Sequence, residues 1–258
     1  MRAPGADDEV RGKSCKLMAD SRTAPTNHLR STSRCLLYYI TDRTAFPGDE
    51  SMRCRRLLGK IAEAVRAGVD YIQLREKDLS TRRLEALARA AADVIDQLRA
   101  ENSELKTALL INSRTDLALA ARADGVHLRS EDISPQDVRE IWSRSRGEDS
   151  SVRPTPIIGV SCHSPAEVGR AAAAASFAVF APVFEKKDAG AARPAGLAQL
   201  SEACNASIPV LALGGVTVRN ALSCLEAGAS GIAAIRLFQE THVASVAESL
   251  RNLERGSD

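Results

Sequence analysis

Short, mostly apolar runs alternate with longer amphipathic segments along most of this chain. The runs hold four or five residues and show no strict alternation of polarity, which is typical of parallel strands buried on both faces. Eight such runs are predicted as strands: Leu36–Ile40, Tyr71–Leu74, Ala108–Ile111, Gly125–Leu128, Ile157–Val160, Phe177–Ala181, Val210–Leu213 and Gly231–Ile235.

Segments with helical periodicity separate these runs. Two of them begin after a serine with proline in the first turn, at Ser134 and Ser164, which is a favourable helix start. The predicted helices are Arg55–Ala67, Thr81–Ala100, Asp116–Arg122, Pro135–Trp142, Pro165–Ala175, Leu197–Ala203, Arg219–Ala227 and Val243–Leu253. This alternation predicts an α/β fold, a single (β/α)8 TIM barrel over residues 35–258. An open three-layer sheet is the alternative.

Two segments depart from this pattern. Residues 1–34 are rich in Arg, Ser, Thr, Asp and Pro without an apolar period, so we expect a disordered extension. Its acidic residues 7–9 argue against an organelle transit peptide, and a gene start at Met18 is an equal alternative. Ser143–Arg153 is expected to be a surface loop.

Composition narrows the functional classes. A length of 258 residues suits one barrel. The net charge of +2 argues against a nucleic-acid partner bound by a wholly basic surface. No apolar stretch is long enough for a membrane span, so no membrane partner is expected. The six cysteines form no C-x-x-C pair and are expected as free thiols of a cytoplasmic protein. Aromatic residues make up 3%, so Ala, Leu, Val and Ile should build the core.

The carboxyl ends of barrel strands are where chemistry is expected. After the second strand, alternation sends Gln73, Arg75 and Lys77 to the same side, where an amide and two cations would bind a phosphate or diphosphate. An ordinary solvated loop is the alternative. Asn112 ends the third strand. Asp132, behind the fourth strand, could hold Mg²⁺ or simply lie near a helix N-terminus.

The second half of the chain adds further candidates. His163 is a candidate acid or base, or else a residue that orients its loop. Its neighbour Cys162 should point the opposite way. The charged segment with Lys186 and Lys187 suits a lid. The loops after strands seven and eight predict a phosphate site made by Gly214, Gly215, Ile235 and Arg236.

Several phrases, taken in order, resemble the thiamin phosphate synthase/TenI family over residues 36–250. They are Tyr39-Ile40-Thr41-Asp42-Arg43, Gln73-Leu74-Arg75-Glu76-Lys77, Ala123-Asp124-Gly125-Val126-His127-Leu128, Glu131-Asp132, Ile158-Gly159-Val160-Ser161-Cys162-His163-Ser164, Pro182-Val183-Phe184 and Leu213-Gly214-Gly215-Val216. The resemblance implies a (β/α)8 barrel, often dimeric, so a homodimer is allowed.

The resemblance also implies roles for these residues. A synthase joins hydroxymethylpyrimidine diphosphate to a thiazole phosphate and releases diphosphate with Mg²⁺. Gln73, Arg75, Lys77 and Asn112 would then bind the pyrimidine diphosphate, with Lys77 also catalytic. Ser161 would lie by the leaving group as a binding and catalytic residue, and Lys186 and Lys187 would close over it. Gly214, Gly215, Ile235 and Arg236 would bind the thiazole phosphate, and Asp132 would hold Mg²⁺.

Some positions depart from the synthase pattern. Ser113 stands where synthases usually carry the second metal carboxylate, Arg236 stands where a serine is expected, and the segment around Lys186 lacks two threonines. His163 matches the histidine of TenI-type thiazole tautomerases, which need no cofactor. The resemblance therefore implies a synthase, with a tautomerase or a non-catalytic thiazole or thiamin phosphate binding barrel as alternatives.

Overall fold

Eight parallel strands close into a ring in the computed structural model of the chain, which describes residues 1, 34–145, 155–185 and 194–253. Each strand pairs with its sequence neighbour and β8 pairs with β1, so the predicted TIM barrel is confirmed. The strands are β1 (Leu36–Ile40), β2 (Tyr71–Leu74), β3 (Ala108–Asn112), β4 (Gly125–Leu128), β5 (Ile157–Cys162), β6 (Phe177–Phe180), β7 (Val210–Ala212) and β8 (Gly231–Ala234).

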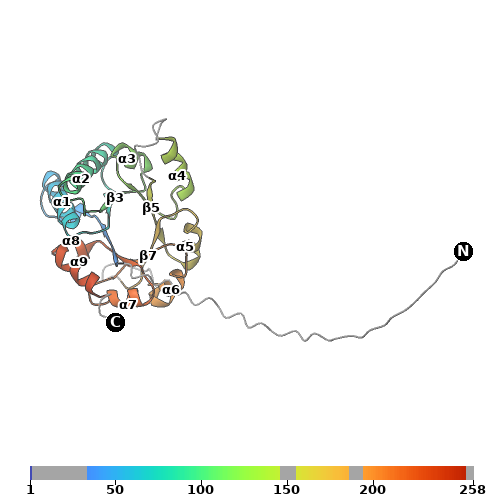
Figure 1. Cartoon of the computed structure of the whole chain (residues 1–258). Coiled ribbons are helices and arrows are strands. Elements are labelled where there is room, and N and C mark those ends of the chain that lie inside the picture. The colour runs from blue at the N-terminus through green and yellow to red at the C-terminus, as the bar shows by residue number, and fades with distance from the viewer. Residues whose placement is uncertain (2–33, 146–154, 186–193, 254–258) are drawn as a thin grey trace. The chain divides into compact units, whose positions relative to one another are not determined.

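The helices form an outer ring around the strands (Figure 1). They are η1 (Arg43–Ala45), α1 (Glu50–Arg66), α2 (Thr81–Glu101), α3 (Thr115–Ala120), α4 (Pro135–Arg144), α5 (Pro165–Ala171), α6 (Gly196–Ala203), α7 (Ala221–Glu226), α8 (Arg236–Gln239) and α9 (Val243–Asn252). Ser134 and Ser164 cap α4 and α5 as predicted. Helix α1 begins five residues before its predicted start, because Asp49 caps it by accepting the N–H of Met52 at 2.8 Å.

The chain divides into two compact units, Met1–Ser33 and Arg34–Asp258. Apart from Met1, the first unit lies outside the described residues, so its disorder stays a prediction. Most of the predicted loop Ser143–Arg153 lies outside them too, and Ser143 and Arg144 belong to α4. Among the described residues, the cysteines are free thiols and no helix has the length and apolar character needed to cross a bilayer.

Two apolar clusters build the core. The larger lies between the strands and the helices and consists mostly of Ala, Leu, Val and Ile, as expected. The smaller fills the barrel interior, where Tyr38 and Phe177 are fully buried. The ring of Tyr71 stacks on Phe177 with centroids 4.8 Å apart, and Tyr38 packs edge-on against both. Three of the nine aromatic residues thus pack together inside the barrel, where they close the floor beneath the site.

The turns that precede alternate strands fasten the amino-terminal rim of the barrel. Asp70, before β2, accepts the backbone N–H of Leu37 on β1 at 2.8 Å. Asp124, before β4, accepts that of Leu109 on β3 at 2.7 Å. The hydroxyl of Ser176, before β6, accepts the N–H of Ile158 on β5 at 3.0 Å. Neighbouring strands are therefore held in register at the end opposite the predicted site.

Candidate active site at the barrel mouth

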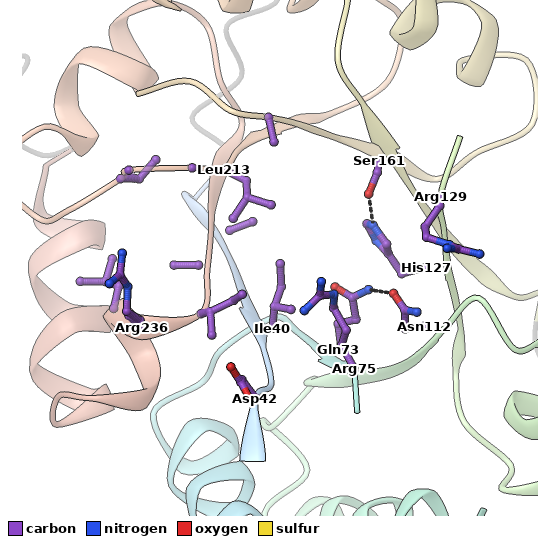
Figure 2. A pocket seen from close by; sticks show the side chains of 18 of the residues that line it. Ile40, Asp42, Gln73, Arg75, Asn112, His127, Arg129, Ser161, Leu213 and Arg236 are labelled. Atoms are coloured by element: carbon purple, nitrogen blue, oxygen red, sulfur yellow. Dashed lines mark hydrogen bonds between the residues drawn. The ribbon is translucent and has the colours of Figure 1, made fainter. Parts of the chain in front are cut away.

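A cavity of about 1080 Å³ opens at the carboxyl ends of the strands. Figure 2 shows side chains from both halves of the barrel converging on it. Ten predicted site residues line this cavity: Gln73, Arg75, Lys77, Asn112, Ser161, His163, Gly214, Gly215, Ile235 and Arg236. Lys186 and Lys187 lie outside the described residues. Asp132 is not among the residues that line the cavity.

The β2 side of the cavity carries an amide pair. Gln73 is buried, and its Nε2 donates a hydrogen bond to Oδ1 of Asn112 on β3 at 2.9 Å (Figure 2). This bond fixes the orientation of both amides. Gln73, Arg75 and Lys77 all line the cavity, as alternation predicted, and Asn112 joins them, while their role in binding a diphosphate stays a prediction.

Two cations extend this side without neutralising partners. Among the residues described, neither Arg75 nor Lys77 makes an ion pair. The nearby Arg75 lowers the pKa of Lys77, as do burial of the ammonium group and the charge of Arg129. Arg75 and Lys77 bring positive charge to this end of the cavity, and an anion bound there would relieve the repulsion between the cations.

A buried network behind β2 holds the cationic loop in place. Glu76 points away from the cavity and accepts hydrogen bonds from the hydroxyl of Thr41 at 2.6 Å and from Nη1 of Arg43 at 3.2 Å. The same Thr41 hydroxyl accepts the backbone N–H of Arg75 at 3.0 Å. Arg43 is also bound by Glu50 and Asp78. Glu76 thus acts through Thr41 as a positioning residue for the Arg75 backbone.

A second polar chain runs from the barrel floor to the cavity. The hydroxyl of Tyr38 lies 3.1 Å from Nδ1 of His127, and Nε2 of His127 lies 2.8 Å from Oγ of Ser161 (Figure 2). Burial and the charge of Arg75 lower the pKa of His127 to about 3. His127 is therefore neutral, and it orients the hydroxyl of Ser161 at the cavity wall. Gly159 leaves room for it, because a Cβ there would lie 2.8 Å from Nδ1 of His127.

His163 follows β5 and, like Ser161, lines the cavity. Its Nδ1 is 2.7 Å from the carbonyl oxygen of Ala181, and because a carbonyl can only accept, Nδ1 carries a hydrogen. In the neutral ring the lone pair is then on Nε2. The side chain of Cys162 points into the outer core, and burial raises the pKa of its thiol to about 12. The expectation that these neighbours do not pair is confirmed.

Glycines and a short helix form the β7–β8 side of the cavity. Gly214 and Gly215 have φ of +97° and +67°. A Cβ on Gly215 would lie 2.7 Å from Cβ of Phe184. These glycines are thus required by their backbone conformation and by the close packing of the two loops. Helix α8, which carries Arg236, is held to β1 because Oε1 of Gln239 accepts the hydroxyl of Tyr39 at 2.9 Å.

Asp132 is held by Arg129. The backbone N–H and Nη2 of Arg129 donate to its two carboxylate oxygens at 2.7 and 3.0 Å. Burial raises the pKa of Asp132, but hydrogen bonds from Arg129 and Ser113 outweigh this effect and hold the pKa below its usual value. Among the described residues, no three His, Cys, Asp or Glu side chains group to hold a metal. One carboxylate already bound by a guanidinium does not fit the oxygen-rich donor set of Mg²⁺.

Three features of the site were not predicted from the sequence. The buried pair of Tyr38 and His127, the support of the Arg75 loop by Thr41 and Glu76, and the position of Arg129 all depend on contacts between separate strands or turns. Alternation along β4 did send His127 and Arg129 to the same side, which is the one signal that could have found them.

Comparisons with known proteins point to one family. A family model described as thiamine monophosphate synthase matches residues 37–238. A protein from Geobacter sulfurreducens is 40% identical over 202 residues, covering 77% of this chain and 84% of that protein. Thiamine-phosphate synthase of Roseiflexus castenholzii is 37% identical over 209 residues, with coverages of 79% and 81%. The structure of thiamine phosphate pyrophosphorylase from Pyrococcus furiosus superposes with a TM-score of 0.66 at 29% identity, covering 85% of this chain and 95% of that one.

Proposed function

Because the chain belongs to the thiamine monophosphate synthase family, we propose that it joins hydroxymethylpyrimidine diphosphate to a thiazole phosphate and releases diphosphate. The single observation that best supports this is one cavity lined by two separate groups of residues suited to binding anions. The first group is Gln73, Arg75, Lys77 and Asn112, and the second is Gly214, Gly215, Ile235 and Arg236. A reaction between two phosphorylated molecules needs both.

The proposed reaction breaks one bond and forms another, and it places negative charge near the β2 side of the cavity. The bond between the pyrimidine methylene carbon and the diphosphate oxygen breaks, and diphosphate leaves with the electron pair. The thiazole nitrogen then donates its lone pair to that carbon and forms the new carbon–nitrogen bond. Negative charge grows on the leaving oxygen, so fixed cations placed there lower the barrier. Arg75 and Lys77 supply them, and the amides of Gln73 and Asn112 orient the substrate.

Ser161 and the loops complete the proposed site. Its hydroxyl, held by His127 at 2.8 Å, would donate to the departing diphosphate. The Gly214-Gly215 backbone and Arg236 would bind the phosphate of the thiazole, as loops after strands seven and eight do in other barrels. Asp132 is paired with Arg129, so this carboxylate is not assigned a role in holding Mg²⁺ during the reaction.

One observation favours a second candidate, thiazole tautomerisation. His163 lines the cavity with Nδ1 held by Ala181, and among the described residues its Nε2 has no hydrogen-bond partner. A neutral Nε2 facing a substrate can remove and return a proton without a cofactor.

The deciding experiment compares both reactions in purified protein. Synthase activity predicts thiamin phosphate and stoichiometric diphosphate from the two substrates, reduced about 10²-fold or more in Lys77→Ala. The exposed Lys106→Ala is the matched control and should leave the rate unchanged. Tautomerase activity predicts isomerisation of the thiazole phosphate carboxylate that His163→Ala abolishes. Absence of coupling in the wild type, with tautomerisation present, would replace the first proposal by the second.

A further inference from the structure

Arg129 contacts Ser113, the residue that stands where synthases usually carry the second metal carboxylate. Its Nε donates to Oγ of Ser113 at 3.1 Å, and Nδ2 of Asn112 donates to the same oxygen at 3.1 Å. Its Nη2 and backbone N–H bind the two oxygens of Asp132. The guanidinium therefore joins the two positions, 113 and 132, at which the family resemblance would place metal carboxylates.

This guanidinium also belongs to the anion-binding end of the cavity. Arg129 lines the main cavity together with Arg75, Lys77 and Asn112, and it lies on the same side as Asn112 and His127 (Figure 2). A smaller neighbouring pocket of about 300 Å³ shares Lys77, Asn112 and Arg129 with it. The three cations thus line one cavity, and the charges of Arg75 and Arg129, together with burial, lower the pKa of Lys77.

We propose that Arg129 joins Arg75 and Lys77 in binding the diphosphate group and supplies the positive charge that a divalent metal ion would otherwise bring. The inference rests on the proposed function for its ligand, and it adds that diphosphate binds without metal. Arginine suits this role because it remains charged at every working pH and presents N–H groups in a plane that matches phosphate oxygens.

The surroundings of Arg129 favour this assignment over a bound metal. The Ser113 hydroxyl already accepts two N–H donors, and each oxygen of Asp132 accepts one N–H of Arg129. A divalent cation at these oxygens would face the guanidinium charge at close range. Asp132 has a side chain that is 10% exposed against 53% for Arg129, so the carboxylate anchors the arginine while its guanidinium remains open to a ligand.

The first test is calorimetric binding of inorganic pyrophosphate to the full-length protein, in EDTA and in MgCl₂. We expect the wild type to bind in EDTA. Arg129→Ala should weaken that binding about 10- to 100-fold, the loss expected for one charge-assisted contact. Arg129→Lys should recover part of it. Arg89→Ala is the matched control, because Arg89 is an exposed arginine of α2 paired with Glu85, and it should change nothing.

A second test restores the metal pattern. In the double variant Ser113→Asp/Arg129→Ala two carboxylates replace the guanidinium. Ser113 has φ of +59°, a conformation in which aspartate is favoured among non-glycine residues, so the backbone should accept the change. Electron paramagnetic resonance of added Mn²⁺ should show binding to the double variant and none to the wild type. Pyrophosphate binding should then require the metal.

The outcomes separate the two proposals. Wild-type binding of pyrophosphate only in MgCl₂, with Arg129→Ala unchanged, would overturn the inference and leave the synthase assignment standing. Mn²⁺ binding to the wild type that Asp132→Asn abolishes would overturn it as well. If pyrophosphate binds under neither condition, the diphosphate site itself fails, and the proposed function fails with it.

Discussion

Nε2 of His127 lies 2.8 Å from Oγ of Ser161, and this contact links the buried barrel floor to the reactive end of the cavity. On its other side, Nδ1 of His127 lies 3.1 Å from the hydroxyl of Tyr38. The two neutral tautomers of the ring reverse the direction of both hydrogen bonds. In the tautomer with hydrogen on Nε2, Tyr38 donates to His127, His127 donates to Ser161, and the serine hydroxyl is left to donate toward a ligand.

If His127 acts through Ser161, the two residues should not contribute independently to catalysis. We expect Ser161→Ala and His127→Phe each to lower kcat about 10- to 100-fold, and the double variant to lose no more than the worse single one. His127→Gln, which keeps an amide near the Nε2 position, should recover part of the rate. The rates of diphosphate release of the wild type, the two single variants and the double variant form a double-mutant cycle. Fully additive losses would show that His127 does not act through Ser161.

The same histidine makes stability depend on pH. Burial and the charge of Arg75 lower its folded pKa to about 3, whereas an unfolded chain protonates histidine near pH 6.5. The unfolded state thus binds the extra proton as pH falls below about 6.5, and the free energy of unfolding should decrease by up to about 1.4 kcal/mol per pH unit. Urea titrations between about pH 7 and pH 5 measure this slope. His127→Gln should remove that contribution, and an identical slope in the variant would contradict the prediction.

Much of the architecture could be predicted from the sequence, for a physical reason. Strands buried on both faces need continuous apolar runs, and the carboxyl ends of such strands meet at one mouth, so Gln73 and Arg236 could be placed at one cavity although they are far apart in the chain. The early start of α1 was missed. Pro47 and Gly48 favour a loop, and this outweighed the capping signal of Asp49 in the prediction.

The electrostatic pairing was harder to predict. A carboxylate such as Asp132 has the same identity whether it faces a metal or a guanidinium, and only the turn that brings Arg129 onto it decides between them. Alternation along a strand predicts the direction of a side chain but does not identify its partner. The contact between His127 and Ser161 depends on the register of β4 against β5, and the sequence of one strand does not determine that register.

Glu76 is expected to be the most sensitive carboxylate outside the cavity. Its side chain is 1% exposed and accepts hydrogen bonds from Thr41 and Arg43. Glu76→Gln should cost about 1 to 3 kcal/mol of unfolding free energy, because an amide group then faces a buried donor. It should also weaken pyrophosphate binding by disturbing the Arg75 backbone. Glu85→Gln, at an exposed pair with Arg89, should cost less than about 1 kcal/mol. Equal losses would refute the network.

Two glycines offer a matched pair for the β7 loop. Gly215 and Gly196 both have positive φ, at +67° and +77°, but a Cβ on Gly196 would meet nothing within 4 Å. Gly196→Ala should therefore cost only the backbone strain, about 1 to 2 kcal/mol. Gly215→Ala adds contact with Phe184 and should cost at least about 1 kcal/mol more, with weaker binding of the thiazole phosphate. Chemical denaturation and calorimetry measure the two effects, and equal stability losses would show that the loops can separate.

The fastening of the amino-terminal rim has a consequence for connectivity. Arg34, just before β1, and Arg251, at the end of α9, both bind the carboxylate of Asp70. The two ends of the described barrel thus meet at one side chain, on the face opposite the cavity. A short linker could join them in a circular permutant whose new termini fall in the exposed turn at Ser103 and Glu104, on that same face. The order in which the chain visits its eight strands would change while every wall of the cavity stayed in place.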